Sequence, residues 1–136
     1  MGQLGDGTTA DEVAPTAVIG GLLFESLAAG AYYSTYDYDY FAPIASFTCG
    51  VATGGNAYCW RSGIRGQLRT GANPVMATTP QPVASAISFT GLRAGTTHVC
   101  GLAIGGAAYC GGTYSAGLEY GGVISDSDKP MPLFGP

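Results

Sequence analysis

The hydrophobic positions of this 136-residue chain fall in short runs that are bounded by glycine or proline. Such runs occur around Val18, Leu22–Leu27, Thr48–Ala52 and Asn56–Trp60. Short apolar runs between turn residues are typical of the strands of a small sheet. No stretch shows the 3.6-residue periodicity of an amphipathic helix. The pattern therefore predicts an all-β chain of short antiparallel strands.

The strand pattern repeats along the chain with a shift of 51 residues. Residues 47–60 and 98–111 are identical at eight of fourteen positions, and residues 15–30 match residues 80–95 at a shift of 65, which leaves a 14-residue insertion between Gly30 and Phe47. A unit of about 50 residues with several short strands predicts one blade of a β-propeller, the alternative being an irregular sandwich or barrel. We expect a single repeat-containing domain over residues 1–136. Its units are approximately 1–60 (with the insertion at 31–44), 61–111 and a partial unit at 112–136.

The four cysteines form two pairs with the same spacing. Cys49 and Cys59 flank one Gly-Gly step, and Cys100 and Cys110 flank another. If each pair lies on a hairpin that turns at the glycines, its two members are directly opposed at about 4.5 to 5.5 Å, within disulfide reach. Reduced core cysteines and a zinc site are the alternatives, although paired zinc ligands are commonly two to four residues apart. Disulfides would indicate an oxidising, extracytoplasmic setting.

Several motifs resemble one repeat family. They are the Gly-Gln-Leu-Gly-Asp-Gly-Thr-Thr sequence at 2–9, the Leu-x-Ala-Gly sequences that end at Gly30 and Gly95, His-Val-Cys-Gly-Leu at 98–102 and Ala-Tyr-Cys-Trp at 57–60. Together these are similar to the regulator of chromosome condensation repeat in its cysteine-bearing bacterial form. The resemblance implies a seven-bladed β-propeller that binds proteins through its loops. The chain departs from the family pattern at Arg61, where that pattern has glycine after Tyr-Cys-Trp.

About 2.5 units cannot close a ring of seven blades. Repeat architectures bury their faces by stacking on neighbouring units, and nothing in the sequence resembles a polar cap. We therefore expect an incomplete propeller with open blade faces that is completed by self-association. The alternative is a departure from the propeller into a sandwich-like packing.

The insertion is the first candidate binding surface. It holds five of the nine tyrosines, and tyrosine gives a large amphipathic contact at low entropic cost. In an extended conformation its alternating residues put aromatic rings on one face and carboxylates on the other. The alternative is a structural edge hairpin. The candidate partner-binding residues of this Tyr/Asp loop are Tyr32, Tyr33, Tyr36, Asp37, Tyr38, Asp39 and Tyr40.

The charge distribution suggests a second surface. Residues 1–60 carry six acidic and no basic side chains, whereas residues 61–93 carry four arginines and no acid. Complementary patches at different places suit a head-to-tail contact between copies, although intramolecular pairing or a solvated face explains them equally well. We add Trp60, Arg61, Arg65 and Arg69 to the candidate partner-binding residues. The net charge of −4 argues against nucleic acid as a partner, and no apolar run is long enough for a membrane-spanning helix, so we expect no membrane insertion.

The sequence contains no recognisable catalytic constellation. There is one histidine and no nucleophile-elbow sequence, so no triad is supported. Asp126, Ser127 and Asp128 lack the full ligand set of a calcium loop and are expected to form a solvated turn. We expect no catalytic residue, no metal and no cofactor. The sequence thus predicts a non-enzymatic, extracytoplasmic protein-interaction module that binds itself or another protein. The alternatives are a subunit of an extracellular filament and a carbohydrate-binding or other lectin-like module.

Overall fold

The computed structural model describes residues 2–32, 45–62, 76–112 and 127–132 and contains eight strands in these ranges. They are β1 (Phe24–Tyr32), β2 (Ala45–Ala52), β3 (Ala57–Ser62), β4 (Met76–Pro82), β5 (Phe89–Ala94), β6 (His98–Ala103), β7 (Ala108–Gly112) and β8 (Ser127–Pro132). No helix occurs within these described ranges.

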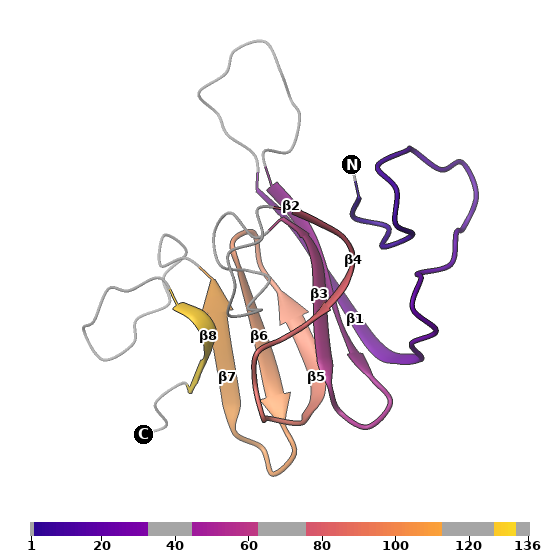
Figure 1. Cartoon of the computed structure of the whole chain (residues 1–136). Helices are drawn as coiled ribbons and strands as arrows, with labels where there is room; N and C mark the ends of the chain where they lie inside the picture. Colours follow the sequence, from indigo (N-terminus) through magenta and orange to yellow (C-terminus); the bar gives the residue numbers. More distant parts are fainter. Residues whose placement is uncertain (1, 33–44, 63–75, 113–126, 133–136) are drawn as a thin grey trace.

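The strands form two four-stranded antiparallel sheets, each in chain order (Figure 1). We call β1–β4 the first sheet and β5–β8 the second sheet. The all-β antiparallel prediction is confirmed. The sheets are offset from the sequence units, because β4 follows residue 61 in the chain and yet completes the first sheet.

The two central hairpins place the cysteines as the spacing predicts. Cys49 pairs directly with Cys59 between β2 and β3, and Cys100 pairs with Cys110 between β6 and β7. Both pairs form disulfides with a Cα–Cα distance of 4.0 Å, and neither is left as a free thiol. The alternatives of reduced cysteines and a zinc site are therefore excluded for these pairs.

The insertion lengthens one hairpin. Pairing between β5 and β6 ends at Ala94 and Val99, whereas pairing between β1 and β2 continues past the equivalent positions to Tyr32 and Ala45. The loop is therefore carried at the end of an extended hairpin of the first sheet. Residues 33–44 themselves lie outside the described residues.

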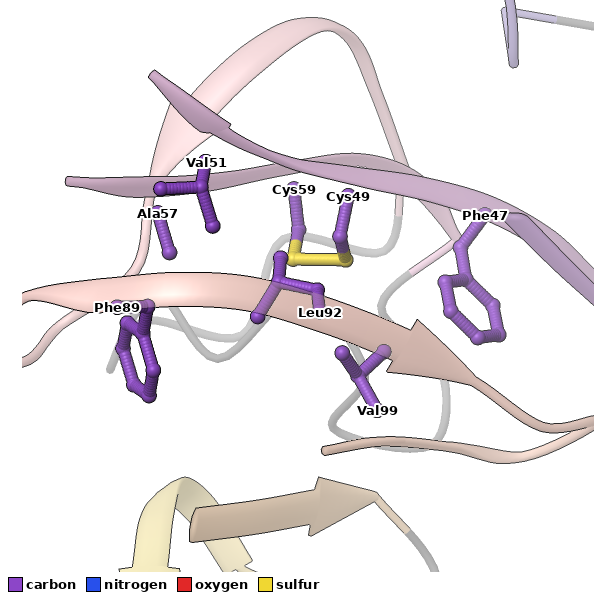
Figure 2. Close-up of a cluster of buried hydrophobic side chains, with 8 residues drawn as sticks. All are labelled: Phe47, Cys49, Val51, Ala57, Cys59, Phe89, Leu92 and Val99. Atoms are coloured by element: carbon purple, nitrogen blue, oxygen red, sulfur yellow. A yellow bond between two sulfur atoms is a disulfide. The ribbon is translucent and has the colours of Figure 1, made fainter. Parts of the chain in front are cut away.

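The hydrophobic core lies between the two sheets. Figure 2 shows Leu92 of the second sheet pointing toward the Cys49–Cys59 disulfide of the first. Burying a side chain such as Leu92 stabilises a fold by about 1.5 to 3 kcal/mol, so this interface contributes much of the stability. The core residues are Phe47, Cys49, Val51, Ala57 and Cys59 from the first sheet and Phe89, Leu92 and Val99 from the second.

Glycines allow the sheets to approach each other. A Cβ built on Gly30 would collide with the carbonyl oxygen of Gly95 and lie 2.5 Å from the Phe47 ring, whereas a Cβ on Gly91 meets only the Ser26 hydroxyl at 3.8 Å. We expect Gly30→Ala to lower the free energy of unfolding by about 1 to 3 kcal/mol through overpacking. The matched variant Gly91→Ala should leave it within about 0.5 kcal/mol of the parent. Urea denaturation measures both values, and equal stability of the two variants would contradict the close approach.

Candidate functional site

Each sheet has two distinct faces. The aromatic face is formed by Phe24, Leu27 and Tyr58 in the first sheet and by Phe89, Leu92 and Tyr109 in the second. The disulfide face is formed by Cys49, Val51 and Cys59 in the first sheet and by Cys100, Leu102 and Cys110 in the second. Inside the molecule, the disulfide face of the first sheet packs against the aromatic face of the second.

The remaining two faces are open, as the side-chain exposures show. Leu27 is 57% exposed, whereas its repeat equivalent Leu92 is 4% exposed. Leu102 is 49% exposed, whereas its equivalent Val51 is 0% exposed. One aromatic face and one disulfide face thus remain uncovered by the described residues, and they are the same two kinds of face that meet inside the molecule. The prediction of open blade faces is confirmed for this part of the chain.

The open aromatic face already has the shape of the covered one. The rings of Phe24 and Tyr58 are 6.3 Å apart at an interplanar angle of 87°, and those of Phe89 and Tyr109 have the same distance and angle. Edge-to-face pairs of this kind are favourable in themselves. The face of the first sheet is therefore formed without a neighbouring sheet against it.

The N-terminal segment covers one end of the open aromatic face. The carbonyl oxygen of Gln3 accepts hydrogen bonds from Trp60 Nε1 at 2.8 Å and from Thr48 Oγ1 at 3.0 Å. The Gly5 backbone passes so close that a Cβ there would lie 2.7 Å from Trp60 Nε1. In Figure 1 this segment lies on the side of the first sheet away from the second sheet. It is a partial cover, because Leu27 stays exposed.

The same segment ends in a charged turn. Asp6 Oδ1 accepts hydrogen bonds from the backbone N–H of Thr8 at 3.0 Å and from its hydroxyl at 3.1 Å. The backbone hydrogen bond lowers the pKa of Asp6 below its usual value because it favours the carboxylate. Asp6 thus remains a carboxylate at neutral pH, in the segment that covers one end of the aromatic face.

Two of the residues predicted to bind a partner lie in the interior. Trp60 is 1% exposed and Arg61 is 8% exposed. Trp60 packs on Phe24, with ring centroids 5.7 Å apart, and anchors the N-terminal segment. Trp60 is thus a packing residue of the first sheet, and neither side chain presents a surface to a partner here.

The other predicted residues are mostly beyond the described ranges. Tyr32 is the last residue of β1, where its backbone pairs with Ala45. The expected solvated turn at 126–128 is wrong in part, because Ser127 and Asp128 begin strand β8 and the backbone of Ser127 pairs with Gly112. The calls outside the described residues are Tyr33, Tyr36, Asp37, Tyr38, Asp39, Tyr40, Arg65, Arg69 and Asp126.

Arg61 occupies a backbone position that suits glycine. Its φ is 84°, and its repeat equivalent Gly112 has a φ of 131°. In both sheets the pairing register shifts next to this position, as in a β-bulge. A non-glycine residue in such a conformation costs about 1 to 3 kcal/mol, which explains why glycine is the expected residue here.

One further segment corresponds to an outer strand in the repeat register but is not part of either sheet. Residues 11–17 are the repeat equivalents of β4, at the shift of 65, but they form no strand and all of them are exposed. Val13, in the middle, is fully exposed at 105%. Like β4, which contains Pro80 and Pro82, the segment contains a proline, as is common in edge strands. This segment was not predicted, although the repeat register contained the signal.

Leu27 and Leu102 were also missed as surface residues. Both occupy positions where the other repeat has a large apolar side chain, Leu92 and Val51 respectively. The sequence shows the equivalence of these positions but not which copy is covered. Only the packing order of the sheets decides that.

Metal-ligand clusters and membrane-spanning helices are both absent from the described residues. No group of three or more histidine, cysteine or acidic side chains is arranged to hold a metal ion among the residues that the structure describes. The same part of the chain has no helix that is long and apolar enough to cross a membrane.

The fold is similar to that of known propellers. No protein-family model matches the sequence, and no curated protein matches it. The structure of Prp20p from Saccharomyces cerevisiae superposes with a TM-score of 0.65 at 17% identity, over 99% of this chain and 33% of that one. Yeast RCC1 (Prp20) in its complex with Kap60 gives a TM-score of 0.64 at 17% identity, over 88% of this chain and 26% of that one.

Human WBSCR16 gives a TM-score of 0.56 at 16% identity, over 64% of this chain and 22% of its own length. The chain thus spans about a third or less of each of these structures. The repeats, the two disulfide-bearing sheets and these superpositions together identify the fold as an incomplete β-propeller of the RCC1 type, of which the described residues form two blades.

Proposed function

We propose that this protein is a non-enzymatic protein-interaction module that associates through its open blade faces. The observation that carries the proposal is the pair of open faces. Leu27 on one and Leu102 on the other are half exposed, although their repeat equivalents are at most 4% exposed. Apolar side chains gathered on one face mark interaction surfaces more often than single scattered ones do. The two open faces are of the kinds that bind each other inside the molecule, so a second copy is a suitable partner.

The comparisons support a binding function in general terms. The titles of the similar structures describe Kap60 bound to yeast RCC1 and the binding of Prp20p to Gsp1p and histones. By analogy of fold alone, we propose that this chain also binds proteins. The Tyr/Asp loop, at the end of the extended β1–β2 hairpin, is the proposed second contact.

An extracytoplasmic location is part of the proposal. Two disulfides in a chain of this size are typical of proteins from oxidising compartments. The low share of charged residues, 10%, fits a protein whose surface is covered in an assembly.

Sedimentation velocity tests the proposal. At micromolar concentration and modest salt we expect species larger than the monomer, because both open faces are available at once. A folded particle that stays strictly monomeric over this range would overturn self-association. Alanine at Tyr36, Tyr38 and Tyr40 together tests the loop separately, since it should weaken partner binding without changing the fold.

The open faces also favour a second candidate, a subunit of an extracellular filament. Two different faces at opposite sides of one molecule make a heterologous contact, which continues indefinitely unless the rotation closes a ring. Electron microscopy distinguishes the two candidates. Long regular polymers would support the filament, and discrete particles would support the interaction module.

A further inference from the structure

A groove runs along the open disulfide face of the second sheet. It has a volume of about 570 Å³. Arg93, Cys100, Leu102 and Ala108 of the second sheet are among the residues that line it, together with Ser26 of β1 in the first sheet. The groove is larger than a crevice between two side chains and is lined by exposed apolar and basic groups. A suitable occupant is partly apolar, because Leu102 is 49% exposed in the groove.

The molecule itself shows what fills the equivalent place. On the first sheet, the surface equivalent to the groove is covered by β5, the first strand of the second sheet. The backbone N–H of Leu92 on β5 donates a hydrogen bond to Ser26 Oγ at 3.3 Å. The close approach of Gly30 and Gly95 fixes the same two strands at their other end. The natural occupant of the groove is therefore a strand equivalent to β5.

The strand equivalent to β5 that still has an uncovered face is β1. Its Leu27 is 57% exposed, and Phe24 and Tyr58 beside it already have the ring geometry of the covered pair. Since this face is formed in advance, binding does not incur the cost of ordering it. The charges are also complementary, because β1 carries the exposed Glu25 and the groove carries the exposed Arg93.

We propose that the groove of the second sheet receives the aromatic face of the first sheet from a second copy of this chain, with β1 lying where β5 lies on the first sheet. The contact is head-to-tail and repeats the internal packing of the two sheets. This inference rests on the proposed self-association and names the surfaces that it uses.

The test uses one charged substitution on each face. Leu27→Asp places a carboxylate on the aromatic face and leaves the groove intact, and Leu102→Asp does the reverse. Each variant alone should bind its own copies at least about 10-fold more weakly, since a buried unpaired charge costs more than the 1.4 kcal/mol that a factor of ten represents. An equimolar mixture should form a one-to-one dimer with the affinity of the parent, because one intact groove meets one intact aromatic face.

Met76→Asp is the matched control. Met76 is 56% exposed and lies on the outer strand β4, at the edge of the first sheet opposite to β1, so its variant should assemble like the parent. Analytical ultracentrifugation measures the parent, the three variants and the mixture, and near-ultraviolet circular dichroism establishes that each protein is folded. A mixture that stays monomeric would overturn the proposed contact, since both faces it needs are present.

The outcomes separate this inference from the proposed function. If the parent assembles and both single variants assemble equally well, self-association holds and the groove contact is wrong. If the parent is monomeric, the proposed self-association and the groove contact are both wrong. The open faces would then be expected to bind a blade of a different protein. Only weakened single variants together with a restored mixture support the head-to-tail contact.

Discussion

Replacing both Cys49 and Cys59 by alanine is expected to destabilise the protein more than replacing both Cys100 and Cys110. Each disulfide spans a sequence separation of 10 residues. Replacing either pair therefore removes the same loop-closure contribution to stability, about 3 kcal/mol. The difference arises from burial. Cys49 and Cys59 are 0% and 2% exposed in the core between the sheets, whereas in the second pair Cys110 is 1% exposed but Cys100 is only partly buried. Loss of the first pair therefore leaves the larger cavity, which adds about 1 kcal/mol.

The comparison has an internal control, because the two hairpins have the same length and the same cysteine register. Urea denaturation of both double variants gives the two losses, and mass spectrometry before and after reduction verifies that the remaining disulfide is formed. Equal destabilisation would show that the Cys49–Cys59 pair is not packed between two sheets. A larger loss from the Cys100 and Cys110 replacement would contradict the packing order itself.

Trp60→Ala is expected to lower the free energy of unfolding by about 3 to 5 kcal/mol, the usual range for a large aromatic side chain that is fully buried. Trp60 is 1% exposed, packs on Phe24, and holds Gln3 through the bond from its indole N–H. We also expect the segment 2–7 to leave the sheet, because two of its contacts are lost together. Hydrogen exchange at the amide of Gly7, which donates to the carbonyl of Thr78, reports this release.

Trp60→Phe separates the two contributions of the side chain. Phenylalanine keeps most of the packing but has no N–H, so the loss should be smaller and include about 1 kcal/mol for the missing hydrogen bond. Faster exchange at Gly7 in both variants, together with a large stability loss only in Trp60→Ala, is the expected pattern. Unchanged exchange in Trp60→Ala would mean that the segment is held by other contacts.

The local structure was predictable because it depends on short-range pattern. The Gly-Gly steps and the cysteine spacing fixed the two central hairpins, and the structure pairs Cys49 with Cys59 at the predicted register. The shift of 65 located the insertion, which the structure places at the end of the β1–β2 hairpin. Each of these features involves residues that are close in sequence or related by one repeat.

The long-range packing was not predictable in the same way. The bond between Trp60 and the Gln3 carbonyl joins residues 57 positions apart, and no periodicity indicates it. The interior placement of Arg61 was missed because arginine is rarely buried and its repeat equivalent, Gly112, has no side chain to compare with it. The open faces depend on which sheet lies against which, and equivalent residues such as Leu27 and Leu92 are indistinguishable in sequence.

With segment 11–17, the described residues contain three segments in the repeat position of an outer strand, but only two sheets. In one molecule, β4 at the edge of the first sheet leads into β5, which packs on that sheet. At the proposed head-to-tail junction β1 takes the place of β5, so segment 11–17 of one copy would lie at the edge of β7 in its neighbour. That edge is already held by β8, which pairs with β7 at three positions, against four between β3 and β4. Two strands competing for one edge is the condition for domain swapping, in which a neighbour's strand replaces the chain's own. A junction of this kind would be tightened or released by exchanging a single strand, with neither sheet unfolding.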